Sequence, residues 1–395
     1  MSLLHVALGA MLLQQAFGYV CQLVLPILAP EVADALGISP EWLGLFQFLT
    51  HSTGIVAAMA CGGFIVRYGA LRVAQVTLAL MAGGVLLAGT GMIWLMPIAA
   101  MLLGLTYGST PSSSHILARL SPPHLAPLIF SIKQAAVPVG SLVAGYAVPA
   151  AYTMFGLWGA FVATAIASLA FAALLQVLRP RLDDDRKPDH PLSFGDVRAT
   201  VTSVLASRAL RGLALTAFSL GGLQAVFATF FVTFLIRDID FTLAAAGELF
   251  GISGAVALVT RIIWGWLGGL IVGVRPLVAG LTLGGAASAF VMALVDPSWP
   301  WLAVAAVAIA YNATAISWHG ILIAEVARLA PEGRVGAMVG GILACNGIGM
   351  MSYPALFGVI AGIAGHYGVA FAVLGVPALV VGLLLACERR ETQAT

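Results

Sequence analysis

The chain has 395 residues, of which 61% are hydrophobic and 9% are charged. An ordinary soluble domain has about 25% charged residues, so this composition excludes a soluble globular fold. Eighteen Lys and Arg residues against sixteen Asp and Glu residues give a net charge of +2, which leaves no basic excess for nucleic acid. The four cysteines lie far apart without the spacing of a disulfide framework or a zinc site, and we predict no metal and no cofactor.

Twelve apolar segments are long enough to cross a membrane, since a spanning helix needs about 20 mostly apolar residues for a hydrocarbon core of roughly 30 Å. The predicted spans are residues 4–29, 42–66, 73–95, 97–118, 128–152, 157–178, 212–236, 245–267, 277–295, 301–324, 335–360 and 368–386. The alternation typical of β-barrel strands is absent, so we predict an all-α membrane protein. The first segment is longer than a signal-peptide core and is expected to be retained.

The positions of Lys and Arg predict the orientation, because short loops rich in these residues stay in the cytoplasm. With both termini inside, fifteen of the eighteen basic residues fall in cytoplasmic loops, in the termini or in a central linker. The outer loops then carry acidic residues, namely Glu31, Asp34, Glu41, Asp238, Asp240 and Asp296. We therefore predict an integral protein of the bacterial inner membrane with both termini cytoplasmic.

The only long polar stretch, residues 179–211, divides the twelve predicted spans into two groups of six. This predicts an N-terminal six-helix bundle (1–178), a cytoplasmic linker (179–211) and a C-terminal six-helix bundle (212–395). The halves resemble each other: Gln15 matches Gln224, and Arg119 matches Arg328, each 209 residues apart. Parallel repeats of this kind imply two pseudo-symmetric bundles about an axis along the membrane normal.

The loop between the second and third spans reads Gly62-Gly63-Phe64-Ile65-Val66-Arg67-Tyr68-Gly69-Ala70-Leu71-Arg72. It resembles the G-x-x-x-D-R-x-G-R-R signature of the major facilitator superfamily, with Val66 in place of the acidic residue. The resemblance to this family of transporters covers essentially the whole chain. In the family the loop locks the two halves together on the cytoplasmic side, which makes Gly62, Arg67, Gly69 and Arg72 candidate gating residues. The missing carboxylate leaves open whether that charge relay operates here.

Two further segments, residues 130–140 and 261–267, resemble prokaryotic members of this superfamily that carry small organic anions. The second is similar to the monocarboxylate and oxalate–formate groups, in which an Arg of the eighth span meets a substrate carboxylate. That resemblance implies a substrate-binding role for Arg261.

Arg261 and Lys133 are the two basic residues that fall within predicted spans. A charged side chain inside a membrane is costly and normally faces a wet cavity or a partner. With no acidic residue on their level, the natural counter-charge is a carboxylate solute, which Arg holds by a bidentate fork and Lys by a point contact. The alternative is that both side chains extend to the cytoplasmic surface.

Uncharged polar residues within the spans are candidates for the wall of the same cavity. Gln15 and Tyr19 share a face of the first span, and Gln224 takes the position of Gln15 in the seventh. Asn346 in the eleventh span completes the set. Hydrogen bonds between helices explain these residues equally well.

Histidine titrates near neutral pH and is a candidate for proton coupling where carboxylates are scarce. His51 lies in the second span and His319 in the tenth, seven residues after Asn312 and so on the same helical face. His319 is also a candidate substrate contact. The alternative for both is a hydrogen-bonded core imidazole.

The sequence thus predicts a monomeric secondary transporter that moves a small organic anion by alternating access, by symport with protons. One alternative is an efflux carrier that exchanges protons for apolar or cationic compounds. Another is a membrane sensor or accessory protein that does not transport. No catalytic constellation is present, so we predict that the protein is not an enzyme.

Overall fold

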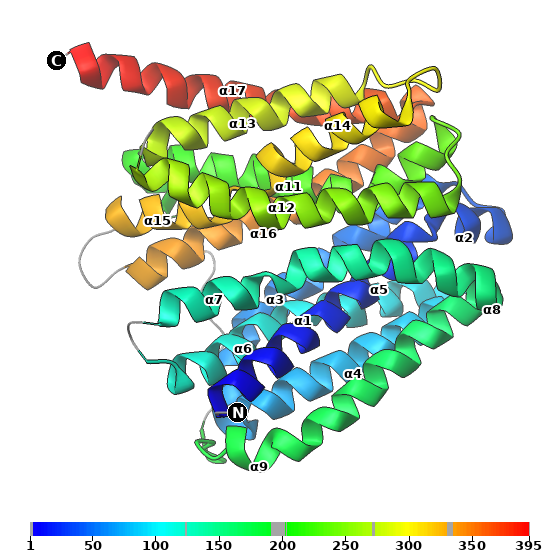
Figure 1. Ribbon diagram of the computed structural model, residues 1–395, viewed down its shortest axis with the longest axis vertical. Coiled ribbons are helices and arrows are strands. Elements are labelled where there is room, and N and C mark those ends of the chain that lie inside the picture. Colours follow the sequence, from blue (N-terminus) through cyan, green and yellow to red (C-terminus); the bar gives the residue numbers. More distant parts are fainter. Residues whose placement is uncertain are drawn as a thin grey trace. The chain divides into compact units, whose positions relative to one another are not determined.

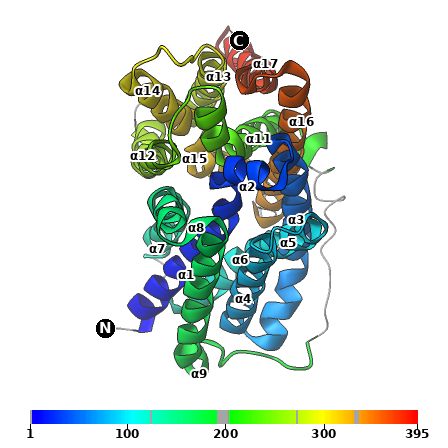
Figure 2. The ribbon, with the colours of Figure 1, turned by 90° about the vertical axis from the view of Figure 1, so that its right-hand side faces the viewer.

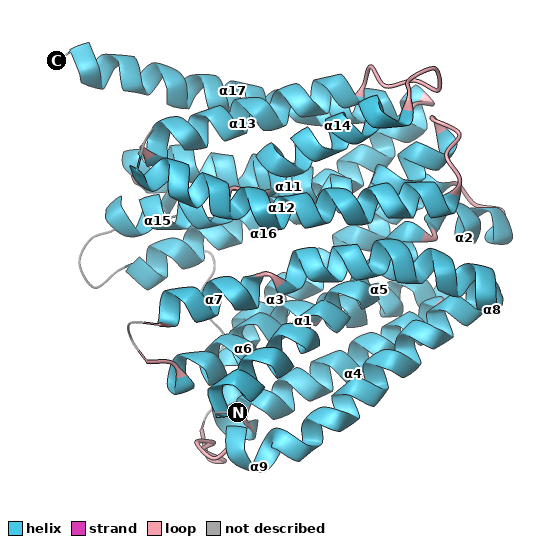
Figure 3. Ribbon diagram, in the orientation of Figure 1, coloured by secondary structure: helices cyan, strands magenta, loops and turns pink. Residues whose placement is uncertain are grey.

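The computed structural model describes residues 3–122, 125–190, 202, 204–270, 273–329 and 335–394, and within them every regular element is a helix (Figure 3). The chain divides into two compact units. One contains Met1–Ser39 and Leu49–Gly195, and the other contains Pro40–Phe48 and Asp196–Thr395. The predicted borders of the bundles, at residues 178 and 211, stay a prediction.

The first unit holds α1 (Leu3–Ile27), α2 (Ala29–Leu36), most of α3 (Leu43–Tyr68), α4 (Ala70–Ala88), α5 (Met96–Gly104), α6 (Thr106–Leu120), α7 (Ala126–Gln134), α8 (Ala136–Leu174) and α9 (Arg179–Leu182) (Figure 1). Helix α1 packs along α8 and α4, and α4 packs against α5, α6 and α8 (Figure 2). The interior at one end of this packing is apolar, with Met11, Leu71 and Leu117 fully buried.

Helix α8 contains most of the fifth predicted span, which begins in α7, and most of the sixth. Its backbone leaves the helical conformation at Gly156, where φ is 74° and ψ is 178°. A side chain would be strained there, so glycine allows the chain to reverse without a loop. The apolar run around it, Ile132–Leu182, has 51 residues, which at 1.5 Å each gives about 77 Å, more than twice the thickness of the hydrocarbon core. The eleven apolar runs found among the described residues therefore accommodate the twelve predicted spans.

The second unit holds α11 (Arg208–Arg237), α12 (Leu243–Leu270), α13 (Val274–Met292), α14 (Trp301–Tyr311), the π-helical turn η4 (Asn312–Ile316), α15 (His319–Leu329), α16 (Val335–Ala364) and α17 (Tyr367–Ala394). Helix α11 packs against α16 and α17, and α13 packs against α17. Aromatic contacts join these helices: the rings of Phe230 and Phe357 are stacked with centroids 4.4 Å apart, and those of Phe357 and Phe371 meet edge to face with centroids 4.9 Å apart.

The tenth span is not one regular helix. The π turn η4 interrupts it between α14 and α15, so the α-helical spacing that placed Asn312 and His319 on one face does not apply. Asn312 instead donates from Nδ2 to the carbonyl oxygen of Ala308, 2.9 Å away in its own helix. A π turn leaves backbone groups out of the α-helical pattern, and such turns are frequent at functional sites.

Candidate functional site

Arg261 lies in α12, inside the apolar run Leu243–Gly268. Its side chain is half-buried, and Nη2 donates a hydrogen bond to the carbonyl oxygen of Ile316, 3.4 Å away. Ile316 is the last residue of the π turn. The guanidinium is therefore directed at the irregular part of the tenth span.

Three further side chains tie α12 to the π turn. Trp264 Nε1 donates to the carbonyl oxygen of Ala313 over 2.6 Å. The hydroxyls of Thr260 and Ser317 lie 2.8 Å apart, and Ser317 Oγ donates to the carbonyl oxygen of Asn312 over 2.9 Å. These side chains give partners to polar groups inside an apolar span, so the turn is held in a fixed place beside Arg261.

His319 is the first residue of α15, three residues after the end of the turn, and is stacked on Trp318 with ring centroids 3.9 Å apart. The charge of Arg261 acts on the imidazole. His319 Nδ1 is buried and has no hydrogen-bond partner in the described part of the chain. The structure thus brings together two of the predicted site residues, a permanent cation and a titratable ring.

Lys133 marks a second polar site, in the first unit. Its side chain is 1% exposed in α7. The ammonium nitrogen lies 3.4 Å from the carbonyl oxygen of Thr110 and 3.5 Å from the hydroxyl of Ser114. Gln15 reaches the same residue, with Nε2 3.5 Å from Thr110 Oγ1. Among the described residues no carboxylate oxygen lies within 4.0 Å of Lys133, so only long, neutral contacts compensate this buried charge.

The other residues predicted to line the solute cavity lie where helices pack against each other. Tyr19 of α1 is half-buried and packs against Gly140 of α8. Gln224 of α11 is buried, and its Oε1 has no hydrogen-bond partner in the part of the chain that the structure describes. Asn346 of α16 packs against Gly221 of α11. His51 is buried in α3.

The predicted gating loop is held by a carboxylate from the linker. Gly69, with φ at 98°, precedes the first turn of α4, and Asp183 accepts hydrogen bonds there from the backbone nitrogens of Leu71 (2.7 Å) and Arg72 (3.0 Å). The Asp183 side chain is 3% exposed and lies 3.7 Å from Arg179 Nε. Burial raises the pKa of Asp183 despite these hydrogen bonds and the charge of Arg179.

The next two linker residues hold α6. Arg119 Nη1 lies 2.6 Å from Asp184 and 2.7 Å from Asp185, and His115 Nε2 is 2.7 Å from the other oxygen of Asp185. Burial opposes ionisation of Asp185, but the His115 hydrogen bond and the Arg119 charge outweigh it and lower the pKa of this carboxyl. The run Asp183-Asp184-Asp185 therefore holds the loop and the end of α6 in place.

The sequence analysis did not identify several of these residues as part of the site. Thr110 and Ser114 lie in a visible hydroxyl-rich run, residues 106–114, which could have indicated polar contacts for Lys133. Trp264 lies three residues after Arg261 and could have been placed near it on α12. Nothing in the sequence indicates that Asp183 caps α4, because that contact joins distant segments.

The fold and these buried cations define a polytopic membrane transport protein. The sequence profile of the Major Facilitator Superfamily matches residues 9–325 and 213–395, and the chain belongs to this family. The family and the similar proteins described next are transporters, not enzymes.

Two curated proteins of Mycobacterium tuberculosis, from strains CDC 1551 / Oshkosh and ATCC 25618 / H37Rv, are described as "Probable nitrate/nitrite transporter NarK2". Each is 29% identical to the chain over 258 residues, covering 64% of this chain and 62% of the relative. The match thus spans less than two thirds of the length of these relatives.

Solved structures with the same fold include a peptide transporter POT in complex with sulfate, at a TM-score of 0.77 and 13% identity over 98% of this chain and 94% of that one. The nucleoside transporter NupG matches at a TM-score of 0.76 and 13% identity, over 97% of this chain and 99% of that one. At these identities the likeness shows the fold alone, and it agrees with the twelve-helix arrangement predicted from the sequence.

Proposed function

We propose that the protein is a secondary transporter that moves a small organic anion, a carboxylate, by alternating access. The observation that carries this proposal is Lys133, a cation 1% exposed within an apolar unit, with no carboxylate within 4.0 Å in the described residues. Placing a charge in the membrane costs from about 3 to more than 10 kcal/mol, and an anionic solute offsets that cost when it binds. The cytoplasmic position of both termini stays a prediction.

Arg261, in the second unit, is a separate candidate for binding the anion. A guanidinium offers two parallel N–H donors, which match the two oxygens of a carboxylate. The ties between α12 and the π turn support this role, because they fix the position of the guanidinium before substrate arrives. In this proposal Gln15 and Thr110 orient the solute beside Lys133.

Proton coupling is assigned to His319, with His51 as the alternative. His319 lies close enough to Arg261 for their charges to interact, so an anion bound at Arg261 favours the protonated imidazole. Binding of the anion and of the proton would then support each other, which is the requirement for symport.

Nitrate or nitrite is the second candidate substrate, favoured by the two M. tuberculosis relatives. These ions share with a carboxylate a single negative charge spread over coplanar oxygens. The same Arg fork therefore suits both, and the experiment below separates them.

The test is binding and uptake by the purified full chain. Thermal shifts with acetate, lactate, oxalate, nitrate, nitrite and chloride identify the anion, and its Kd is then measured for Arg261→Gln, Arg261→Lys and Lys133→Gln. Loss of one charge-assisted hydrogen bond, about 1.5–3 kcal/mol, weakens binding about tenfold to more than a hundredfold. Arg211→Gln removes the same charge from an exposed position in the first turn of α11 and serves as the matched control. Arg261→Lys should fail nearly as badly as Arg261→Gln if the fork matters.

Uptake into proteoliposomes under an imposed pH gradient tests the coupling. His319→Gln should still bind the anion but no longer accumulate it. If correctly folded Arg261→Gln and Lys133→Gln both bind as tightly as the parent protein, the anion site is wrong. Proton-driven efflux of an apolar or cationic compound would then become the leading function.

A further inference from the structure

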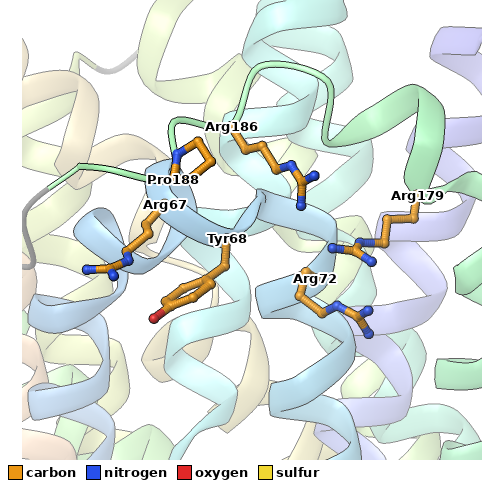
Figure 4. A pocket seen from close by; sticks show the side chains of 6 residues that line it. All are labelled: Arg67, Tyr68, Arg72, Arg179, Arg186 and Pro188. Carbon is orange, nitrogen blue, oxygen red and sulfur yellow. The ribbon is translucent and has the colours of Figure 1, made fainter.

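A cavity of about 310 Å³ opens at one end of the first unit, away from Lys133 and Gln15. It is lined by Arg67, Tyr68, Arg72, Arg179, Arg186 and Pro188 (Figure 4). Four of these six residues are arginines, and none of the six is acidic. This cavity is small enough for a compact anion and lies at the lower end of the size range of small-molecule sites.

Two sets of backbone contacts hold the walls of the cavity together. The backbone nitrogen of Lys187 donates to the carbonyl oxygen of Val66 over 2.7 Å, which fixes the linker to the end of α3. Asp183 accepts from the backbone nitrogens of Leu71 and Arg72, which fixes the linker to the start of α4. Because both ends of the segment are tied to the loop, the arginines of the linker stay close to those of the loop.

The charges in the cavity are poorly compensated. Arg179 has a carboxylate partner, Asp183, at 3.7 Å, and that carboxylate is already engaged by the two backbone nitrogens. In the described ranges no acidic oxygen lies within 4.0 Å of Arg67, Arg72 or Arg186. Like charges gathered in this way repel one another, and an anion bound between them removes the repulsion.

The arginines are not equivalent. In Figure 4 the guanidinium groups of Arg72, Arg179 and Arg186 lie on one side of Tyr68, and Arg67 extends on the other. Arg67 stacks over the Tyr68 ring, with Cζ 5.5 Å from its centroid. The three grouped guanidiniums are therefore the expected ligand contacts, and Arg67 lies at the rim.

We propose that this cavity binds a phosphate group. A phosphate carries about −1.5 to −2 charges at neutral pH and offers several acceptor oxygens, so more than one Arg fork can engage it at once. A monovalent carboxylate would leave most of the positive charge in the cavity uncompensated. The site is separate from the residues proposed to bind the transported solute, whereas Arg67 and Arg72 also belong to the predicted gating loop.

The phosphate can come from an anionic lipid headgroup or from a soluble phosphate. Tyr68 ends the apolar run Pro40–Tyr68, and Arg72 lies in the first turn of the run Ala70–Ala88, so the cavity lies where these helices leave the hydrocarbon. Tyr68 is 43% exposed, as is typical of aromatic residues at headgroup level. The two arms of the experiment distinguish these sources.

The experiment measures two probes on the purified full chain. Retention of phosphatidic acid, whose headgroup is a phosphomonoester, relative to zwitterionic phosphatidylcholine is followed by native mass spectrometry, and binding of inorganic pyrophosphate is followed by titration calorimetry. The variant is Arg186→Gln, since Arg186 is exposed and its loss should leave folding intact. Arg181→Gln is the matched control, being an exposed arginine of the same linker that does not line the cavity.

The expected result is that the parent protein binds at least one probe and that Arg186→Gln weakens its binding at least about tenfold. Arg181→Gln should stay within about twofold of the parent. Preference for phosphatidic acid alone identifies a lipid headgroup site, and binding of pyrophosphate identifies a soluble phosphate site. The proposal is overturned if neither probe binds the parent protein, or if Arg181→Gln loses as much affinity as Arg186→Gln. Arg72→Gln, checked for monodispersity, provides a second variant with the same expected loss.

Discussion

Helix α4 of the first unit and helix α13 of the second are each preceded by the same backbone turn. Different side chains hold the two turns in place. Gly69 precedes α4 with φ 98° and ψ 143°, and Gly273 precedes α13 with φ 81° and ψ 153°. The turn in the first unit is closed by Asp183, which binds backbone nitrogens at the start of α4. In the second unit Glu325 binds side chains: Arg328 through two bonds of 2.6 and 2.8 Å, and Arg275 at 3.6 Å.

This difference shows how the first loop is held although Val66 takes the place of the acidic residue of the family signature. The acidic residue of the family signature is missing there, yet a carboxylate from the linker holds the loop. The contact is directed at the backbone, so it fixes the fold of the loop itself. The carboxylate of Glu325 acts on two arginines that are 42% and 64% exposed and can turn to water. We therefore expect the first loop to depend more strongly on its carboxylate.

The largest expected effect comes from replacing the glycine of each turn with alanine. Both positions have a backbone conformation that costs a residue with a side chain about 1–3 kcal/mol. At Gly69 a Cβ would also overlap the Asp183 carboxyl, whereas at Gly273 the nearest atom lies 3.8 Å away. Gly69→Ala should therefore lose a further 1–3 kcal/mol or so through the displaced hydrogen bonds. Thermal unfolding in detergent should show the larger fall in Tm for Gly69→Ala, and equal falls would mean that the Asp183 contact contributes nothing.

A smaller effect is expected from neutralising each carboxylate. An Asn at position 183 has a single acceptor oxygen for two backbone donors, so Asp183→Asn leaves one buried N–H without an acceptor and costs about 1–3 kcal/mol. Glu325→Gln should cost less, because the Gln side chain, 2% exposed as the Glu is, keeps an acceptor oxygen for Arg328, and both arginines are exposed enough to regain water. Asp184→Asn, at a side chain that is 65% exposed, is the control and should have little effect on Tm. A greater loss for Glu325→Gln than for Asp183→Asn would contradict the comparison.

The all-helical fold could be predicted from the sequence, because the lengths of the apolar runs and the residues that break them are local properties. The turn at Gly156 falls in the gap predicted between residues 152 and 157, although the sequence around it does not indicate a loop. The π turn could not be predicted, since its hydrogen-bond pattern depends on side chains that α12 brings to it, such as Trp264.

The candidate site was predicted only in part. Arg261 and Lys133 stand out by charge alone in apolar spans, and the position of His319 beside Arg261 appears only in the structure. The linker carboxylates were predicted only as part of a polar cytoplasmic linker. Their contacts with α4 and α6 join segments more than 60 residues apart, and such pairings cannot be read from spacing along the chain.

The smallest expected effect concerns Asp185, which joins the loop region to α6. Its pKa is lowered in the folded protein, so the unfolded chain takes up a proton at a higher pH than the folded chain does. The stability contributed by Asp185 is therefore fully present above its ordinary pKa of 3.8 and is lost as the pH falls through the lower folded value. The difference in Tm between the parent protein and Asp185→Asn should be present at pH 5 and shrink below about 3.8. Thermal unfolding over this pH range measures it, and a difference that grows on acidification would show that His115 and Arg119 do not stabilise the ionised carboxylate.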